Sequence, residues 1–490
     1  MSEYREKGNQ YFKAKQLEEA LWCYTQAIEF DGNDHLSYTN RSLAFYMLSN
    51  YLESLKDANN AIAINSKWFK AYFRKSLALK QLSRYQESLE SLDSALVLIE
   101  NNNNNNINTG EMKSLIQQFN QEYKDISTLL IDSRYKLLTK EMNVDVAYIN
   151  RYKGKGVVSK SNYQANQDIF QESPLVSHIS YKFINNSLFK CCSHCLSTRL
   201  DVKLFSKENL NLYNNIYSNA TTMIRCERDG CNDVYCSIDC LNHAKSQYHQ
   251  VICSSPTDAD LERLYAKAIE YKQTNPLVIL RIYASILQNI TINKLSINNS
   301  LLPFTSFVSN GEWTSQNDTE ILSILKDIFK EYRSKEIEID NLFTINKYRE
   351  FNSIIQCNAS HVNPPSDIHM YINDLVAKTP LSVDHIVVCG KKVTFDNLPE
   401  YLEKFSDLCI SGSALFPIVN SCNHHCNPNA VVSYTTNCNR VTLRSLRSIP
   451  IHEEVEISYI DETVSCSQRR KELQHKYLFN CKCTRCLCEQ

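Results

Sequence analysis

The sequence predicts a multidomain α+β protein, with a helical repeat array at its N-terminus and a β-rich, metal-binding region after it. Three observations predict this class. The chain has 490 residues, 43% of them apolar, which is enough for about two to four domains. Residues 1–100 repeat with a period of 34, and 11 of the 20 cysteines gather in residues 192–253 and 481–488, at spacings that suit metal ions rather than disulfides.

The charge balance favours neither nucleic acid nor a membrane surface as a partner. The chain carries 53 basic and 54 acidic residues, for a net charge of -1. Its first residues, MSEYREKGNQ, lack the apolar region of a secretory signal, and we find no apolar run long enough to cross a membrane. We expect a soluble, monomeric protein of the cytoplasm and/or nucleus that contacts no membrane and does not bind nucleic acid directly.

The repeat is visible when the N-terminal region is aligned on itself with a shift of 34 residues. Two columns then hold small residues and a third holds larger ones: Ala20, Ser54 and Ser88; Ala27, Ala61 and Ala95; Leu17, Tyr51 and Tyr85. Small residues let two antiparallel helices pack closely and stack on the next pair, which is the tetratricopeptide (TPR) pattern. The sequence therefore predicts three TPR repeats over residues 1–100. Chance spacing in an ordinary helical bundle is the alternative.

Within this array, the stretches REKGN, SYTNRS and KWFKAYFRK resemble those of co-chaperone TPR domains. Such domains grip the C-terminal EEVD of cytosolic heat-shock chaperones with basic and asparagine side chains. The resemblance implies EEVD-ending chaperones as partners and a two-carboxylate clamp of Arg5, Asn9, Asn40, Lys70 and Arg74. Arg5 replaces the usual lysine, but a guanidinium still offers donors to a carboxylate. The alternative is a solvated basic face.

A homopolymeric tract, Asn101–Asn106, follows the array. No core can be built from it, and we expect a flexible insertion without chemistry. The periodic stretch from Met112 to about Met142 predicts a last helix that caps the solenoid. The insertion and the helix together make a region of residues 101–145.

A cysteine-rich module follows at residues 192–253. Its pairs are separated by two to four residues, so each pair can reach one ion from a single turn. Structural zinc takes four thiolate or imidazole ligands, and eight ligands make two sites. These ligands are Cys192, Cys195, Cys226, Cys231, Cys236, Cys240, His249 and Cys253. Reduced structural cysteines without metal are the alternative.

The order of these ligands, with Tyr235 just before Cys236, resembles the MYND zinc finger. The resemblance implies a cross-braced pairing, in which the first and third pairs share one ion and the second and fourth share the other. The long gap from Cys195 to Cys226 and the four residues between Cys226 and Cys231 depart from the usual pattern as loop insertions. Cys191 is an alternative ligand to Cys192.

Three stretches near the C-terminus indicate which kind of domain contains this finger. They are NHHCNPN (Asn423–Asn429), EEVEISYID (Glu453–Asp461) and KYLFNCKCTRC (Lys476–Cys486), and RYKGKGVVSK lies upstream of the finger. Their order resembles a SET domain followed by its post-SET loop. NHHCNPN matches the signature of the SET domain, N-H-S-C-x-P-N, except that His425 replaces Ser. The whole resembles the SET and MYND domain (SMYD) lysine methyltransferases, in the branch with N-terminal TPR repeats.

That resemblance implies a SET domain split by the finger and by a helical insert. The implied boundaries are residues 146–191 for the first part of the SET domain, 192–253 for the finger, 254–345 for the insert, 346–462 for the second part and 463–490 for the post-SET tail.

The resemblance also implies the site. Tyr459 is the active-site tyrosine, Tyr477 is its channel partner, and Phe479 stacks near the adenine of S-adenosylmethionine. Tyr459 also contacts the cofactor, and the other implied cofactor-binding residues are Lys153, Gly154, Lys155, Asn358, Asn423 and His424. A third zinc ion is implied between the SET core and the tail, with Cys426, Cys481, Cys483 and Cys486 as ligands.

Methyl transfer from a sulfonium to a lysine amine is an in-line displacement that requires a neutral, aligned amine. Alignment can contribute up to roughly 7–11 kcal/mol, and an apolar channel lowers the lysine pKa. Tyrosine rings suit such a channel because their faces tolerate a passing cation. We expect a protein-lysine N-methyltransferase that uses S-adenosylmethionine and holds about three zinc ions.

Two alternatives remain. The chain is a non-catalytic TPR and MYND adaptor with a degenerate SET scaffold, or it is a transcriptional co-regulator, although no basic stripe with interleaved aromatics supports the latter. The departures His425 and His452, the second where the family usually has Gly, lie near the cofactor pocket and bear on this choice.

Overall fold

The computed structural model describes residues 2–103, 110–185, 189–200, 223–228, 230–253, 258–309, 313–334, 337–379, 383–388, 391–403 and 409–489. The chain divides into two compact units. The first comprises Met1–Lys140 and Val146–Gly156, and the second comprises Glu141–Asp145 and Val157–Gln490. The boundary passes through strands β1 (Val144–Asn150) and β2 (Gly154–Ser159).

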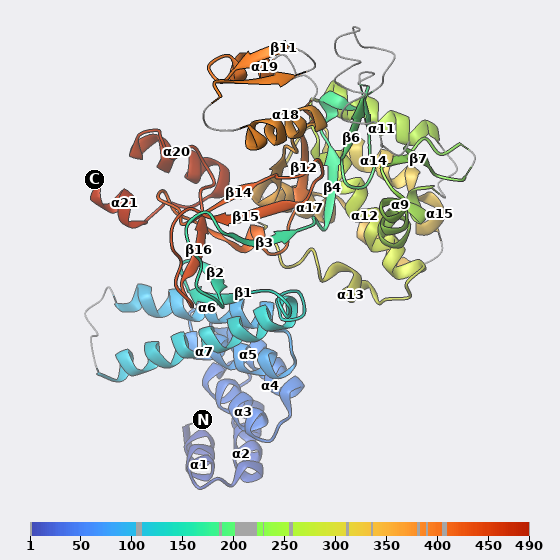
Figure 1. Ribbon diagram of the computed structural model, residues 1–490. Coiled ribbons are helices and arrows are strands. Elements are labelled where there is room, and N and C mark those ends of the chain that lie inside the picture. The colour runs from blue at the N-terminus through green and yellow to red at the C-terminus, as the bar shows by residue number, and fades with distance from the viewer. Residues whose placement is uncertain are drawn as a thin grey trace. The chain divides into compact units, whose positions relative to one another are not determined.

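The first unit is a stack of antiparallel helix pairs followed by a longer helix (Figure 1). Its helices are α1 (Ser2–Lys13), α2 (Leu17–Phe30), α3 (His35–Met47), α4 (Tyr51–Ile64), α5 (Phe69–Gln81), α6 (Tyr85–Asn103) and α7 (Gly110–Tyr135). The second helices of the pairs begin at Leu17, Tyr51 and Tyr85, which are 34 residues apart. The predicted period is therefore confirmed in the helix boundaries.

The turn inside each pair repeats as well. Lys15, Ser49 and Ser83, again 34 residues apart, have left-handed backbones with φ of 62°, 62° and 58°. In each turn the backbone N–H of that residue donates to the carbonyl three residues earlier at 3.0 Å. The six residues of the two small columns are at most 1% exposed, because their helices approach one another there: Ala20, Ala27, Ser54, Ala61, Ser88 and Ala95.

A helix follows the asparagine tract, as expected. Helix α7 packs on the last repeat, where the ring of Phe119 stacks on that of Phe73 with centroids 4.0 Å apart. The tract itself is not entirely separate from the array, because α6 continues as far as Asn103. Asn104–Asn106 lie outside the described residues.

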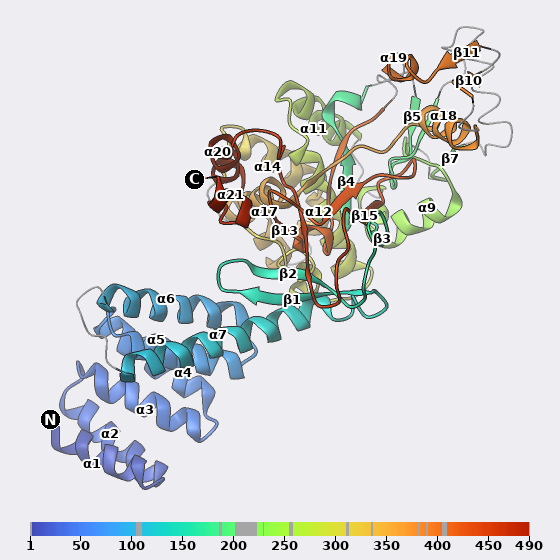
Figure 2. The ribbon, with the colours of Figure 1, turned by 60° about the vertical axis from the view of Figure 1, so that its left-hand side comes forward.

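The second unit contains small sheets that join segments from both ends of its sequence. In one, β12 (Gly412–Leu415) pairs antiparallel with β4 (Val176–Ile179) and β9 (Ser360–Val362). In another, β15 (Val441–Ser445) lies between β14 (Ala430–Ser433) and β3 (Asp168–Glu172). Figures 1 and 2 show β3 and β4, in green, beside the orange and red strands. The β-rich domain is thus split by a long insertion, as predicted.

A third sheet carries the C-terminal motifs. Strand β16 (Glu454–Ile457) pairs antiparallel with β2 and parallel with β13 (Asn423–His424). The remaining strands form hairpins: β5 (Phe189–Cys191) with β6 (Thr198–Leu200), β7 (Ile224–Arg225) with β8 (Val234–Tyr235), and β10 (His385–Val388) with β11 (Lys391–Thr394).

The insertion is helical around α12 (Asn275–Thr291), which is buried along most of its length. Its other helices are α9 (Ile238–Ala244), the π-helix η3 (Lys245–His249), α10 (Gln250–Cys253), α11 (Asp258–Glu270), α13 (Ile297–Leu301), α14 (Asp318–Ile328), α15 (Lys330–Arg333), α16 (Ile337–Asp340) and α17 (Ile345–Asn358). One apolar core joins finger residues such as Tyr235 to α12 and to Leu415 of β12. The finger and the insert are therefore packed onto the β domain as one body.

The wide separation of Asn358 from Asn423 has a structural explanation. Between them lie α18 (Asp367–Lys378), the β10–β11 hairpin and α19 (Leu398–Glu403), all after β9 and before β12. The chain ends with α20 (Cys466–Tyr477) and α21 (Thr484–Cys488). Among the helices that the structure describes, none combines the length and apolar character of a membrane span.

Candidate functional site

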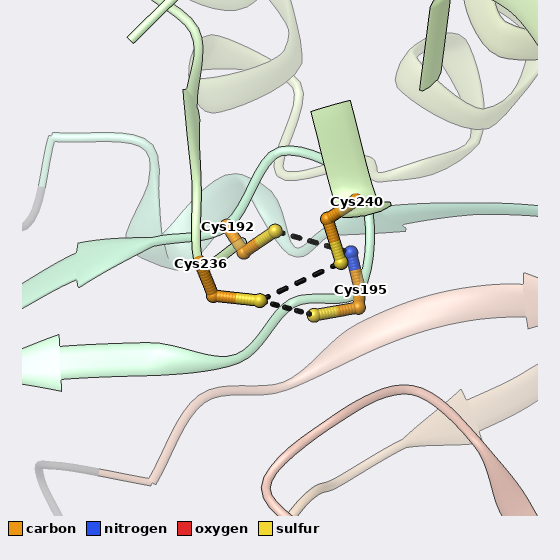
Figure 3. Close-up of side chains that lie close together, drawn as sticks. All are labelled: Cys192, Cys195, Cys236 and Cys240. Atoms are coloured by element: carbon orange, nitrogen blue, oxygen red, sulfur yellow. Dashed lines mark hydrogen bonds between the residues drawn. The ribbon is translucent and has the colours of Figure 1, made fainter. Parts of the chain in front are cut away.

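The twelve predicted metal ligands gather in three groups of four. Within each group all ligand atoms lie within 4.8 Å of one another. The first group contains Cys192, Cys195, Cys236 and Cys240, whose sulfurs converge from the β5–β6 and β8–α9 segments (Figure 3). Neighbouring sulfurs are 3.4–3.5 Å apart. A tetrahedral zinc with four thiolates needs sulfurs about 3.8 Å apart, so this donor set fits zinc.

The second group contains Cys226, Cys231, His249 and Cys253, so the observed grouping follows the cross-braced pairing. His249 Nε2 lies 3.3 Å from the Cys226 sulfur. On the other side of the ring, His249 Nδ1 lies 3.2 Å from Asp233 Oδ2. A carboxylate in this position orients a ligating imidazole, which supports a metal site. Asp233 also accepts a hydrogen bond from Ser193, which ties this ligand set to the first.

The third group joins the NHHCNPN motif to the C-terminal tail. Cys426 is completely buried, and its sulfur lies 3.5 Å from that of Cys486 and 3.9 Å from that of Cys481; Cys483 completes the set. The buried guanidinium of Arg469, on α20, lies 3.8 Å from the Cys486 sulfur. A cation so close stabilises thiolates, so this donor set also fits zinc.

The NHHCNPN stretch lies beside β16, the strand that leads to ISYID. Its first two residues form β13, which runs beside β16 with His424 opposite Ile457. Asn429 is fully buried. Its Oδ1 accepts from the Glu456 N–H at 2.8 Å and its Nδ2 donates to the Glu454 carbonyl at 2.8 Å. Cys426 and Tyr459 thereby lie in one apolar cluster.

Four aromatic rings cluster at this motif: His424, Tyr459, Tyr477 and Phe479. The Tyr459 ring lies 5.3 Å from that of His424, 4.9 Å from that of Tyr477 and 6.5 Å from that of Phe479. Tyr477 Oη donates to the Tyr459 carbonyl at 3.2 Å. The structure therefore brings both predicted catalytic tyrosines together with two predicted cofactor-binding residues.

The Tyr459 hydroxyl is held by the backbone. Its Oη donates to the carbonyl oxygen of Cys422 at 2.6 Å. Burial raises the pKa of Tyr459 well above the ordinary value for tyrosine. The hydroxyl therefore stays protonated at physiological pH, and it uses its proton in the hydrogen bond to the Cys422 carbonyl. Its lone pairs remain as acceptors.

His424 connects this tyrosine to the third cysteine group. The Tyr459 N–H donates to His424 Nδ1 at 3.1 Å, while Nε2 lies 3.2 Å from the Cys426 sulfur. Burial lowers the pKa of His424 to about 4, so the ring is neutral. Because Nδ1 accepts, the proton must reside on Nε2 and point at the sulfur. The predicted contact of His424 with adenine stays a prediction.

The other predicted cofactor residues lie in varied settings. Asn423 Nδ2 donates to Glu454 Oε1 at 2.7 Å, beside the aromatic cluster. The Asn358 amide is engaged by the backbone of Val308 and Ile354, which leaves its predicted cofactor contact untested.

Lys153, Gly154 and Lys155 belong to the first unit. There Gly154 has φ of 68° and Lys155 Nζ donates to Tyr135 Oη at 2.5 Å. Their predicted roles toward the cofactor stay predictions.

His425 and His452, the two histidines that depart from the family pattern, lie in different local structures. His425 Nδ1 accepts from the Asn427 N–H, and Nε2 lies 3.4 Å from the hydroxyl of Thr484 in the tail. His452 is exposed and has φ of 69° in a turn closed by the Glu453 N–H and the Pro450 carbonyl. Positive φ at the third position of a turn favours Gly, which explains why Gly would be usual there.

The five clamp residues all lie on the first helix of a repeat: Arg5 and Asn9 on α1, Asn40 on α3, and Lys70 and Arg74 on α5. Asn40 Nδ2 donates to Asn9 Oδ1 at 2.9 Å, so these two helices place their asparagines together. Arg74 Nε is buried and has no hydrogen-bond partner in the part of the chain that the structure describes, and burial lowers the pKa of Arg74 to about 10. Lys70 Nζ lies 5.6 Å from the ring centre of Trp68.

Several residues of these sites were not singled out from the sequence. Asn429 stood in the quoted motif without a role, and its place in the matched signature was the available signal. Cys422 and Arg469 had no sequence signal, because their contacts are to residues far away in the chain.

Comparison with known proteins agrees with this geometry. Residues 154–460 match the SET domain. This chain belongs to the SET domain family. Protein-lysine N-trimethyltransferase SMYD5 of Danio rerio is 28% identical over 381 residues, which is 70% of this chain and 87% of the relative. A SET and MYND domain-containing protein of Dictyostelium discoideum is 27% identical over 395 residues, 76% of this chain and 97% of that protein. Within the SET family, the chain is therefore an SMYD-type member.

Solved TPR structures also match. The first TPR of Spaghetti (RPAP3) bound to HSP90 peptide SRMEEVD is 30% identical and covers 24% of this chain and 88% of that chain, with a TM-score of 0.21. The TPR2B domain of yeast Sti1 in its Hsp70 complex is 28% identical, with 26% and 94% covered and a TM-score of 0.24. Because these TM-scores are low, we infer the repeat architecture of this SET family member from its own helix pairs.

Proposed function

We propose that this SET family member is a protein-lysine N-methyltransferase that uses S-adenosylmethionine. The observation that carries the proposal is the arrangement of Tyr459, whose hydroxyl is held by the Cys422 carbonyl inside the His424, Tyr477 and Phe479 ring cluster. The SMYD5 relatives, whose name is protein-lysine N-trimethyltransferase, support the same activity. S-adenosylmethionine supplies the methyl group as a sulfonium when it is bound.

The aromatic cluster around Tyr459 suits a lysine amine that must be neutral and correctly oriented. An amine must be neutral to act as a nucleophile, and burial in a channel without water disfavours the ammonium form and lowers its pKa. Since the Tyr459 proton is donated to Cys422, the lone pairs of its oxygen can accept an N–H from the incoming lysine. That hydrogen bond fixes the direction of the nitrogen lone pair. Orientation of this kind is the main contribution that this chain makes to an in-line displacement.

The three cysteine-rich groups have a scaffolding role in this proposal. We propose three zinc ions per chain, one for each group. Cys426 belongs to the third group and also lies against His424, so an ion there would fix both the tail and the ring that supports Tyr459. None of the groups offers an open coordination position, as a catalytic zinc would need.

The first test is binding of S-adenosylmethionine to the zinc-loaded protein by calorimetry, followed by transfer of tritiated methyl groups to a cell lysate. We expect both binding and labelled protein, with the label on lysine. A folded, zinc-loaded protein that binds no S-adenosylmethionine would overturn the proposal and favour an adaptor with a degenerate SET scaffold.

We further propose that the TPR array recruits the enzyme to chaperones that end in EEVD. The supporting observation is Arg74, whose buried Nε has no hydrogen-bond partner among the described residues and would be satisfied by a terminal carboxylate. The paired asparagines Asn9 and Asn40 supply amide donors on neighbouring helices. We expect micromolar affinity for a short EEVD peptide, because few charged contacts act on a flexible ligand. A peptide with an amidated C-terminus that binds equally well would exclude the clamp.

A further inference from the structure

A short segment before the NHHCNPN motif carries the acceptor of the Tyr459 hydroxyl. It begins at Ile418, forms the 3-10 helix η6 (Val419–Ser421) and ends at Cys422, which is completely buried. Cys422 accepts the hydrogen bond from Tyr459 Oη through its carbonyl oxygen at 2.6 Å. The position of this one carbonyl therefore sets the direction of the tyrosine hydroxyl.

The other end of the segment is held by Glu172, at the end of β3. The Ile418 N–H donates to Glu172 Oε1 at 2.8 Å, and the Val419 N–H donates to Oε2 at 2.8 Å. Both carboxylate oxygens are thus used on consecutive backbone donors that start η6. These are charge-assisted hydrogen bonds in a site where Glu172 is only 9% exposed, so they are strong and well oriented.

Glu172 has no cation beside it among the described residues. In the part of the chain that the structure describes, no ion pair involves this residue, and its opposite neighbour on β15 is the apolar Val441. The titratable groups that share its surroundings are the buried Cys422 thiol, whose pKa is raised by burial and by the nearby charges of Glu172 and Glu454, and beyond it Tyr459. Burial raises the pKa of Glu172 to about 7, although the two backbone N–H groups act in the opposite direction.

We propose that Glu172 is a positioning residue for methyl transfer, because its carboxylate holds η6 so that the Cys422 carbonyl fixes the Tyr459 hydroxyl. This inference rests on the proposed role of Tyr459. A negatively charged Glu172 accepts both N–H groups, whereas a protonated Glu172 loses one good acceptor. The alignment of the tyrosine therefore depends on a group that touches neither the amine nor the cofactor.

The test compares Glu172→Gln with Glu172→Asp and a control on the same strand. Glutamine keeps the shape of glutamate but turns an amide NH2 group toward a backbone N–H. We expect kcat to fall by about 10-fold or more while the affinity for S-adenosylmethionine changes less than about 3-fold. Aspartate keeps both acceptors with a shorter reach, and its kcat should lie between those of the wild type and Glu172→Gln. Asp168→Asn removes an exposed β3 carboxylate, which pairs with Arg444, and should leave kcat unchanged.

The pH profile separates positioning from simple destabilisation. Because the wild type should lose alignment as Glu172 is protonated, the ratio of wild-type to Glu172→Gln kcat should shrink toward one between about pH 8 and about pH 6. A ratio that does not change with pH, or a kcat for Glu172→Gln equal to that of the wild type, would overturn the inference. If Glu172→Gln does not fold, Glu172→Asp takes its place in the test, and a kcat of Glu172→Asp equal to that of the wild type would overturn the inference.

Tyr459→Phe, measured beside these variants, keeps the two proposals distinguishable. An inactive Tyr459→Phe with fully active Glu172 variants would overturn only the positioning role. A fully active Tyr459→Phe would overturn the role of the tyrosine and the positioning role with it.

Discussion

Arg5 Nη1 lies 2.8 Å from Asp34 Oδ2, so one cation of the proposed clamp already has an anionic partner within the array. Asp34 also begins α3, where it accepts hydrogen bonds from the Leu36 N–H and the Ser37 hydroxyl. These contacts lower the pKa of Asp34 in spite of its burial, so the carboxylate stays charged. A peptide carboxylate approaching Arg5 therefore meets a nearly neutral pair.

We expect Asp34→Asn to tighten binding of an EEVD peptide by about 3-fold to 10-fold, because it removes a like charge and releases Arg5. Asparagine is as good an N-cap as aspartate, so the stability of α3 should change little. Fluorescence anisotropy of a labelled peptide measures the effect. Glu3→Gln, which removes an exposed carboxylate paired with Lys7, is the control. Weaker binding by Asp34→Asn would show that Asp34 orients Arg5 for the ligand.

Loss of both basic residues on α5 should weaken the same complex. The double variant Lys70→Ala with Arg74→Ala is expected to bind about 10-fold more weakly or worse, about 1.4 kcal/mol, while methylation of a free substrate is unaffected. Lys67→Ala with Lys75→Ala removes the same charge nearby and serves as the control. Equal losses in the two double variants would indicate a general charge effect instead of a clamp.

The third cysteine group should matter more for the cofactor than for folding. Cys426→Ser is expected to lower the zinc content from three ions to two and to weaken S-adenosylmethionine binding by about 10-fold or more, because the ion would fix the tail and His424. Cys236→Ser should instead unfold the finger, whose core residue Tyr235 packs with α12. Elemental analysis, calorimetry and protease sensitivity measure these effects. An unaltered zinc content in Cys426→Ser would exclude the third site.

Tyr459→Phe should abolish methyl transfer, with a loss of about 100-fold or more in kcat and an affinity for S-adenosylmethionine within a few-fold of the wild type. The hydroxyl acts on the amine, so its removal should appear in the chemical step. Tyr434→Phe is a matched control, because Tyr434 also donates to a backbone carbonyl, that of His361, at 3.1 Å. Single-turnover kinetics with tritiated cofactor would decide, and an active Tyr459→Phe contradicts the assignment.

His452→Gly should raise stability by up to about 1 kcal/mol, since a left-handed backbone costs about 1–2 kcal/mol for a residue with a Cβ and glycine recovers part of this. The side chain is exposed, so no packing is lost. Thermal unfolding measures the change. The affinity for S-adenosylmethionine should not change, and a higher affinity of His452→Gly would contradict this expectation by showing that His452 weakens cofactor binding.

Patterns that are local in the sequence were predicted well. The 34-residue columns correspond to the starts of α2, α4 and α6, and the cysteine spacings correspond to groups that converge in space. Both follow from short-range geometry: helix periodicity in one case, and the reach of two ligands from one turn in the other. The extension of α6 to Asn103 was missed, because helix propagation from a packed repeat outweighs the poor propensity of asparagine.

Contacts between residues far apart in the chain could not be predicted from the sequence. The sequence by itself determined the repeat array, the ligand types of the three cysteine groups and the NHHCNPN and ISYID motifs. Only the tertiary structure decided that Cys422 accepts from Tyr459, that His424 carries its proton on Nε2, and that Glu172 holds η6. The physical reason is that a hydrogen bond between residues such as Glu172 and Ile418, which lie 246 positions apart, leaves no periodicity or spacing in the chain.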